Sequence, residues 1–404
     1  MKTPSPFPLV YLLLGALLAA GLYLVWLRSV TPGPDDAEPP LSLTVVGYDA
    51  LRGWTDDDQA GALTAFRRSC AAMLKQPDEK PLDGAGFAGA IGDWRAACEA
   101  AVSHPDNAAR AFFEQWFQPV AIAAGNEPTG LFTGYYAPIV DGSRSRDARH
   151  TVPLYRMPPE LVMLDLGLFR PAMKGERIAG RVEGNRLVPY ATRAEIVAGA
   201  LANRGLEIMW LADPVDAFFL QIQGSGLVRL PDGGLARLGY AGQNGHPYTP
   251  VGRLLIQRGE LTREEVSMQR IRDWITANPG PGAALMDENQ SYVFFEEQQA
   301  EGAIGAQGVP LTGGRSLAID RKYMPLGAPF WLESVGEDGN RHIASLVIAQ
   351  DTGGAIRGMV RGDFYWGEGD QAEHSAGGMK DKGRYYVLLP RPLAERIAAA
   401  PAKP

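Results

Sequence analysis

The sequence lacks the residue patterns on which the common zinc and serine hydrolases depend. Its 404 residues include only 5 histidines, and these stand singly, without an H-E-x-x-H motif or another paired spacing that holds zinc. No serine stands in a G-x-S-x-G motif either. These absences argue against both classes of hydrolase, and we expect neither a metal ion nor a cofactor.

An excess of positive charge is missing too. The net charge is -7 and the pI is about 5.4, with no long run of like charge and no tandem repeat. This balance argues against nucleic acid or anionic lipid as the main partner. In contrast, 48 glycines and 31 prolines indicate many turns and short strands. We therefore expect a β-rich body of two or three domains.

Charge is also absent from one long stretch near the N-terminus. Residues 7–27 read FPLVYLLLGALLAAGLYLVWL, which is close to the ~20 residues needed to span a bilayer core. We favour an uncleaved transmembrane anchor within residues 1–28 over a cleaved signal, for which Ala19-Ala20-Gly21 offers the small residues. No cysteine follows the apolar stretch, which excludes a lipid-modified N-terminus. Residues 29–41, SVTPGPDDAEPPL, predict a stiff linker, so the folded body should begin near Ser42.

Cysteine is scarce, with only Cys70 and Cys98 in the chain. Each lies on a predicted helix. Two thiols in an exported protein are expected to pair, so we predict a structural disulfide between them. Two buried free cysteines are the alternative.

Helical periodicity dominates the first part of the body, and strand-like runs dominate the rest. Apolar spacing predicts helices within residues 56–74, 94–102 and 106–117, the last carrying core aromatics. From Gly130 onward, strand-like runs alternate with turns. These runs are LFTGYYAPIV, AFFLQIQGSGLVRL, SYVFFEE, HIASLVIAQD and GRYYVLLP. Short helices are predicted within 193–204, 250–258 and 263–278.

The tripeptide Asp351-Thr352-Gly353 is the one that aspartic proteases use. Such enzymes need two carboxylates about 3 Å apart that share one proton, and the chain has no second Asp-Thr/Ser-Gly. We therefore reject proteolysis. Three aspartates remain at the ends of strand-like runs: Asp320, Asp351 and Asp363. Brought together and partly desolvated, one of them would stay protonated as a general acid, although each can equally cap a turn.

Tyr, Gln, Asn and Ser gather in glycine-rich stretches in the middle of the chain. Aromatic faces and neutral hydrogen-bonding groups bind sugars without a charged pocket, whereas ordinary surface turns are the alternative reading. The candidate substrate-binding residues are Tyr135, Tyr136, Gln221, Gln223, Ser225, Tyr240, Asn244 and Tyr248.

Taken in order, several motifs resemble the membrane-bound lytic murein transglycosylase A family with its C-terminal three-aspartate domain. The motifs run from about residue 120 to residue 390. They are GYYAP, FFLQIQGSG, GYAGQNGHPY, ENQSYVFF, GVPLTGGRSLAIDRKYMPLGAPFW, AQDTGGAIRG, GDFYWG and GRYYVLLP. The resemblance implies a mainly β fold with N-terminal helices. A double-psi β-barrel domain would be built from residues 42–151 and 289–395, with an inserted β-domain at 152–288 and a groove between the two.

The resemblance also implies an activity. Family members cleave the MurNAc–GlcNAc β-1,4 bond of peptidoglycan glycan strands without water and leave 1,6-anhydro-MurNAc ends. Asp363 matches the single catalytic aspartate of the family, and Asp351 and Asp320 would support it. The chain lacks the lipidation cysteine of the best-known members, so we expect a periplasmic body on an inner-membrane anchor. The alternatives are an inverting polysaccharide hydrolase that uses two aspartates and water on a similar barrel, or a non-catalytic cell-wall binding module.

Overall fold

The structure is a computed structural model that describes residues 38–399 apart from residues 83, 174–176, 300 and 338. The chain divides into Met1–Leu41 and a compact unit, Ser42–Pro404. The expected anchor at residues 7–27 and most of the linker at 29–41 lie outside the described residues. Among the residues that are described, no helix is both long and apolar enough to cross a bilayer.

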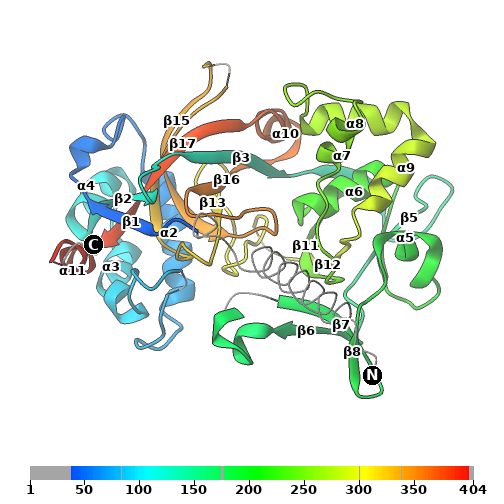
Figure 1. The fold of residues 1–404 in the computed structure, drawn as a ribbon, viewed down its shortest axis with the longest axis horizontal. Coiled ribbons are helices and arrows are strands. Elements are labelled where there is room, and N and C mark those ends of the chain that lie inside the picture. The colour runs from blue at the N-terminus through cyan, green and yellow to red at the C-terminus, as the bar shows by residue number, and fades with distance from the viewer. Residues whose placement is uncertain (1–37, 83, 174–176, 300, 338, 400–404) are drawn as a thin grey trace, which may run out of the picture. The chain divides into compact units, whose positions relative to one another are not determined.

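The largest sheet is built from both ends of the compact unit (Figure 1). Its strand order is β1-β2-β17-β14-β15-β13-β16-β3, and an additional pairing joins β17 to β3. That pairing closes β17, β14, β15, β13, β16 and β3 into a ring. The strands are β1 (Leu41–Val45), β2 (Phe117–Ala124), β3 (Gly130–Ala137), β13 (Ser316–Ile319), β14 (Pro329–Val335), β15 (His342–Asp351), β16 (Arg361–Glu368) and β17 (Lys380–Pro390).

The middle of the chain forms a second, six-stranded sheet and a small three-stranded sheet. The six-stranded order is β12-β11-β10-β4-β9-β5, and the three-stranded order is β6-β7-β8. The strands are β4 (Ile139–Ser143), β5 (Val152–Tyr155), β6 (Leu161–Asp165), β7 (Arg177–Glu183), β8 (Arg186–Val188), β9 (Glu207–Leu211), β10 (Gly226–Arg229), β11 (Leu235–Gln243) and β12 (Val293–Gln298). The inserted segment is therefore longer at both ends than the expected 152–288, because β4 and β12 pair within it.

Helices cover both regions. Those of the compact unit are α2 (Ala60–Met73), α3 (Ile91–Ser103), α4 (Ala109–Trp116), α5 (Arg193–Glu195), α6 (Pro214–Gln223), α7 (Val251–Gln257), α8 (Met268–Ala277), α9 (Pro279–Glu288), α10 (Gly369–Gly377) and α11 (Arg391–Ala399). The three helices predicted before residue 120 are present. Their apolar faces bury Phe66, Trp94, Phe112 and Phe113 completely, as the apolar periodicity requires.

One predicted strand-like run is wrong. All of its first half, AFFLQIQ, belongs to helix α6 rather than to a strand, whereas GLVR in its second half forms β10 as predicted. The Asp213 carboxylate accepts a hydrogen bond from the Val215 N–H at 2.8 Å, Pro214 occupies the first turn, and Gly224 ends the helix with a φ of 78°. These are ordinary helix start and stop signals. Because α6 is buried on several sides, its apolar run resembles a buried strand.

Candidate active site

Two of the three candidate aspartates lie on one face of the ring, on either side of Ala318. Strand β13 runs between β15 and β16, and Ala318 pairs with Asp351 on one side and with Asp363 on the other. Directly opposite residues point to the same face, so only a methyl group stands between the two carboxyl groups. Two strand spacings put their Cα atoms about 10 Å apart.

A bulge in β15 gives Asp351 this direction. The register between β13 and β15 shifts at Gln350, which has no partner on β13. Bulges turn a side chain away from the direction that simple alternation would give it. The Gln350 side chain is fully buried and turns to helix α2, where its Nε2 amide group donates to the Ala65 carbonyl at 2.9 Å. Asp351 therefore points toward the groups that hydrogen-bond its carboxyl group.

The carboxyl group of Asp351 is held by three hydrogen bonds. The backbone N–H groups of Ala306 and Thr352 both donate to its Oδ1 at 2.8 Å, and the Tyr135 hydroxyl donates to its Oδ2 at 3.0 Å. Burial raises the pKa of Asp351 to about 6, and these three donors oppose that rise. Both oxygens are therefore engaged, and the group is positioned rather than free.

The carboxyl group of Asp363 is much less constrained. Among the described residues only Arg361 reaches it, with both guanidinium amino groups 3.4 Å from its Oδ1. Arg361 is itself fixed by a 2.7 Å hydrogen bond to the Thr133 hydroxyl. Burial raises the pKa of Asp363, and the Arg361 charge and hydrogen bonds partly offset the rise. Because 21% of its side chain stays exposed, this carboxyl can meet a ligand.

Asp320 occupies a different setting. It directly follows β13 and is 4% exposed. The Lys322 N–H donates to its Oδ1 at 3.0 Å and the Gly358 N–H to its Oδ2 at 2.8 Å. Arg357 lies 3.9 Å away. Asp320 therefore fastens the turn after β13 to the loop that leads into β16, which is a supporting position.

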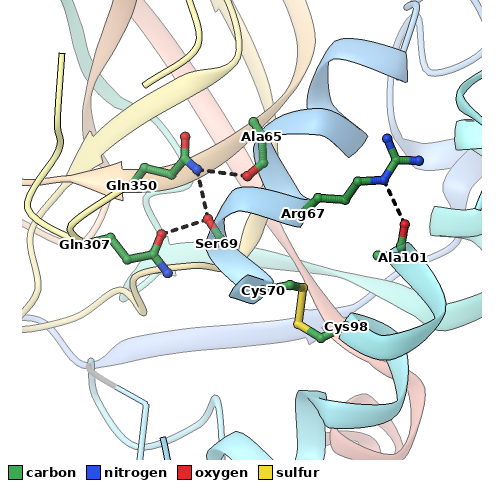
Figure 2. The surroundings of a disulfide bond; sticks show 8 residues. All are labelled: Ala65, Arg67, Ser69, Cys70, Cys98, Ala101, Gln307 and Gln350. Carbon is green, nitrogen blue, oxygen red and sulfur yellow. Dashed lines mark hydrogen bonds between the residues drawn. A yellow bond between two sulfur atoms is a disulfide. The ribbon is translucent and has the colours of Figure 1, made fainter. Parts of the chain in front are cut away.

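A buried polar network connects helix α2 to the loop that holds Asp351 (Figure 2). The Ser69 hydroxyl accepts from the Gln350 amide at 2.9 Å and donates to the Gln307 Oε1 at 2.7 Å. The Gln307 N–H donates to the Gln350 carbonyl at 3.0 Å. Since Ala306 directly precedes Gln307, this network positions the N–H that binds Asp351.

The structure contains the Cys70–Cys98 disulfide, which joins α2 to α3 beside this network (Figure 2). It closes a loop with a sequence separation of 28. In the chain-entropy model such a loop stabilises the fold by about 3–4 kcal/mol. The disulfide therefore holds the helix from which Ser69 reaches the sheet.

Some of the candidate sugar-binding residues are accessible. Tyr240 is 46% exposed and Tyr248 is 38% exposed. The pKa of Tyr248 is raised by burial of its hydroxyl and also by the charge of Asp363, so this phenol lies near the candidate acid. Tyr135 is partly buried and packs on Tyr365 with ring centroids 5.0 Å apart.

Other candidates are placed in the interior and correct the sequence-based expectation. Tyr136 and Asn244 have no exposed surface, and Gln221 and Ser225 are 5% and 8% exposed. Tyr136 packs against helix α10, and Asn244 binds backbone groups at Ala191, Gln290 and Tyr292. These side chains support the fold and do not reach a sugar. Gln223 is partly buried, and its Oε1 accepts from the Tyr136 N–H at 3.2 Å, linking α6 to β3.

A cavity of about 300 Å³ opens along the same strand beyond Asp363. It is lined by residues that include Arg68, Arg237, Thr312, Tyr365 and Glu368. Tyr365 lies two residues after Asp363 on β16, so both point to the same face. Its buried hydroxyl has no hydrogen-bond partner among the described residues. This hollow lies further along β16 from Asp363, and both polar and apolar groups line it.

Sequence reasoning missed Arg361, Thr133 and the Ala306 N–H. For Arg361 the signal was present, because it stands two positions before Asp363 in a strand-like run and must share its face. Thr133 and Ala306 come from segments far away in sequence. No local pattern points to either of them.

The comparisons with known proteins agree with this arrangement. Residues 131–296 match the family model described as the MltA specific insert domain, and residues 315–389 match the 3D domain. The membrane-bound lytic murein transglycosylase A of Escherichia coli K12 is 35% identical over 281 residues, covering 68% of this chain and 69% of the relative.

Solved structures show the same fold. A membrane-bound lytic murein transglycosylase from Agrobacterium tumefaciens is 34% identical with a TM-score of 0.79, covering 88% of this chain and 99% of that chain. The E. coli MltA with bound chitohexaose is 28% identical with a TM-score of 0.64, covering 89% and 97%. A mainly β, two-domain body with helices and a row of aspartates defines the class as a lytic transglycosylase. The chain belongs to the membrane-bound lytic murein transglycosylase A family.

Proposed function

We propose that this enzyme cleaves the MurNAc–GlcNAc β-1,4 bond of peptidoglycan without water and forms 1,6-anhydro-MurNAc ends. One observation carries the proposal: of the two carboxyl groups on the common face, only Asp363 keeps its oxygens available to a ligand. Its contact with Arg361 is long, at 3.4 Å. The raised pKa of Asp363 favours the protonated form that a general acid needs.

In the first half of the reaction, Asp363 acts as the acid. Its proton passes to the glycosidic oxygen, which becomes the 4-hydroxyl of the leaving GlcNAc as the bond to the MurNAc anomeric carbon breaks. Asp363 is then a carboxylate beside the Arg361 guanidinium. The positive charge stabilises this ionised state and lowers the cost of giving up the proton.

In the second half, the substrate supplies its own nucleophile. The C6 hydroxyl of the same MurNAc attacks the anomeric carbon and forms the 1,6-anhydro ring. Its proton returns to the Asp363 carboxylate, so the enzyme ends in its starting protonation state. One carboxyl therefore serves as acid and then as base, and no separate catalyst for water is required.

The three hydrogen bonds that hold Asp351 favour a positioning role over the water-using alternative. An inverting hydrolase needs a second carboxylate that accepts a proton from water. Asp351 already accepts three hydrogen bonds, from Ala306, Thr352 and Tyr135. We assign it the role of positioning Tyr135 and the neighbouring loop, and we assign Asp320 to the turn that shapes the site.

The substrate assignment follows the family and the accessible residues. The E. coli relative carries bound chitohexaose, a chain of β-1,4-linked N-acetylglucosamine, and glycan strands of peptidoglycan share that linkage. We infer that the strand lies in a groove between the two domains, with Tyr135, Tyr240, Tyr248 and Gln223 as contacts. We further infer that the strand ring is the family's double-psi β-barrel, in a periplasmic body on an inner-membrane anchor.

The direct test compares Asp363→Asn with the wild-type enzyme and with Asp351→Asn on purified peptidoglycan. Asparagine keeps the shape of the side chain but cannot cycle a proton, so Asp363→Asn should lose at least about 10²–10⁴-fold in turnover while still sedimenting with peptidoglycan. Asp351→Asn should lose less. Substantial turnover by Asp363→Asn would overturn the assignment, and a larger loss for Asp351→Asn would move the acid to Asp351.

A further inference from the structure

The small sheet of β6, β7 and β8 has an unusual distribution of apolar and charged side chains. Cross-strand pairs Val162–Gly180, Leu164–Ile178 and Val182–Leu187 fall on one face, because opposite residues in adjacent strands share a face. This outer face consists of Val162, Leu164, Ile178, Gly180, Val182 and Leu187. It carries no polar side chain.

The other face contacts the body at two positions and is otherwise largely exposed. Leu161 is buried, and Ala179 packs against the same core cluster of the inserted domain. All the charged residues of these strands also lie on this inner face: Asp165, Arg177, Arg181, Glu183 and Arg186. A half-covered antiparallel sheet normally turns its polar face to solvent. Here the charged face is exposed at Arg181, Glu183 and Arg186, and the apolar face is exposed as well, at Val162, Ile178, Val182 and Leu187.

The exposed apolar surface is concentrated in this module. On the outer face Val182 is 58% exposed and Ile178 is 41% exposed, and in the turn after β6 Leu168 is 85% and Phe169 68% exposed. Of the fifteen large hydrophobic residues exposed in the described part of the chain, eight lie within residues 157–187. A concentration of this kind marks an interaction surface.

The rest of the chain indicates what covers this surface. Residues 7–27 are uncharged and long enough to enter a bilayer. A Pro-rich sequence as long as residues 29–41 spans at most about 40 Å, so an anchor at residues 7–27 would keep the body near the bilayer. The related enzyme in E. coli is described as membrane-bound. A lipid surface is thus the apolar partner that such an anchor would bring within reach of this body.

We propose that the outer face of the β6–β7–β8 sheet, together with Leu168 and Phe169, docks on the lipid bilayer and enters its interfacial region. Burial of apolar side chains drives the contact, as for other interfacial elements. Charge contributes little, because residues 157–190 hold five basic and four acidic residues. Docking therefore needs no anionic lipid and is insensitive to salt. It also fixes the orientation of the body on the membrane.

The test uses the full chain reconstituted in vesicles of phosphatidylethanolamine with a minor fraction of phosphatidylglycerol. Val182→Cys carries an environment-sensitive fluorophore, and Val102→Cys on α3 is the matched control, since Val102 is 66% exposed. The native cysteines are joined in the disulfide and stay unlabelled without reductant. With brominated acyl chains in the vesicles, the probe at 182 should be quenched at least about threefold more than the probe at 102, and salt should not change this.

Equal quenching at the two positions would overturn the proposal. Self-quenching between labelled copies that rises with protein density would point to a second copy of the chain instead. A probe at 182 that is shielded from both lipid and other copies would point to the chain's own N-terminal segment. Either result also overturns the bilayer as the occupant.

A second variant tests the cause. Ile178→Cys reports the contact while Val182→Asp and Leu187→Asp place charges on the outer face. Quenching at 178 should fall to the level of the 102 control. Leu235→Asp with Val335→Asp is the matched pair, because these residues are 55% and 42% exposed elsewhere on the body, and it should leave quenching unchanged. Equal effects of the two pairs would contradict the proposal.

Discussion

Asp351 and Asp363 face the same side of the ring across Ala318, yet only Asp351 has both oxygens filled by hydrogen-bond donors. The two carboxyl groups therefore differ in how readily they can contact a ligand. Asp351 is held in place by backbone N–H groups and a phenol, whereas Asp363 is reached, among the described residues, only by the Arg361 guanidinium at 3.4 Å. This difference in geometry supports our proposal that Asp363 is the acid.

The role of Arg361 predicts a change in the pH dependence. Its charge lowers the pKa of Asp363, so Arg361→Gln should raise that pKa further. Because activity requires protonated Asp363 in the free enzyme, the alkaline limb of the kcat/KM profile should move to higher pH. The maximal rate should fall, since ionised Asp363 loses its stabilising charge.

Arg361→Lys is the matched control for this prediction. It keeps the positive charge while changing the hydrogen bonds, so its alkaline limb should stay close to that of the wild-type enzyme. A limb that is unmoved, or moved to lower pH, in Arg361→Gln would show that Arg361 does not act on the catalytic acid.

The raised pKa of Asp351 predicts a pH-dependent stability. The pKa is about 6 in the folded state, against the ordinary 3.8 of an aspartate side chain. Between these two values the folded state binds more protons than the unfolded state, so stability falls as pH rises through this window. At neutral pH the buried carboxylate costs stability, and below about pH 4 it does not.

Asp351→Asn should therefore stabilise the enzyme at pH 7.5 by about 1–2 kcal/mol and have little effect near pH 4. Asparagine keeps the shape and can still accept from the two backbone N–H groups. Urea unfolding at the two pH values measures the difference. If Asp351→Asn instead has a lower free energy of unfolding than the wild-type enzyme at pH 7.5, the carboxylate is favoured where it lies.

The buried network predicts that a residue far from the substrate affects the rate. Ser69→Ala removes the hydroxyl that connects Gln350 to Gln307, so the Ala306 N–H should move away from Asp351. Buried groups left without partners cost about 1–3 kcal/mol of stability, and kcat should fall by roughly tenfold through lost positioning.

Ser334→Ala provides the comparison for Ser69→Ala. Ser334 is also buried, and its hydroxyl donates to the Asp381 Oδ2 at 3.0 Å, away from the two site aspartates. This variant should lose stability but keep kcat per folded molecule. If both serine variants lose the same fraction of kcat, the network is structural and does not position Asp351.

Much of the fold follows from local patterns in the sequence. The helices around Phe66, Trp94 and Phe112 were predictable because their apolar residues repeat at helical spacing and are buried. Strands such as β15 and β17 were visible as apolar runs bounded by turns. Helix α6 was not, since a helix buried on several sides loses its periodicity; only Asp213, Pro214 and Gly224 mark its ends.

The candidate site residues could be proposed from the sequence, but their geometry could not. The strand ends marked Asp351 and Asp363, but their row across Ala318 depends on a bulge at Gln350 and on pairing between distant strands. Burial separates the other candidate residues. Asn244 resembles a sugar-binding residue in sequence, yet its side-chain amide is hydrogen-bonded to backbone groups in the core. Which candidate residues are buried, and how the two aspartates are placed, depends on packing between segments that are distant in sequence.

The fate of the water oxygen tests the central claim most directly. Purified peptidoglycan is digested in water enriched in heavy oxygen, with a chelator present, and the released muropeptides are weighed by mass spectrometry. If the C6 hydroxyl is the nucleophile, the products carry anhydro-MurNAc ends, are lighter than hydrolysed ones by one water, and contain no heavy oxygen. Reducing MurNAc ends that carry the heavy oxygen from the first turnovers would contradict the account and identify a hydrolase.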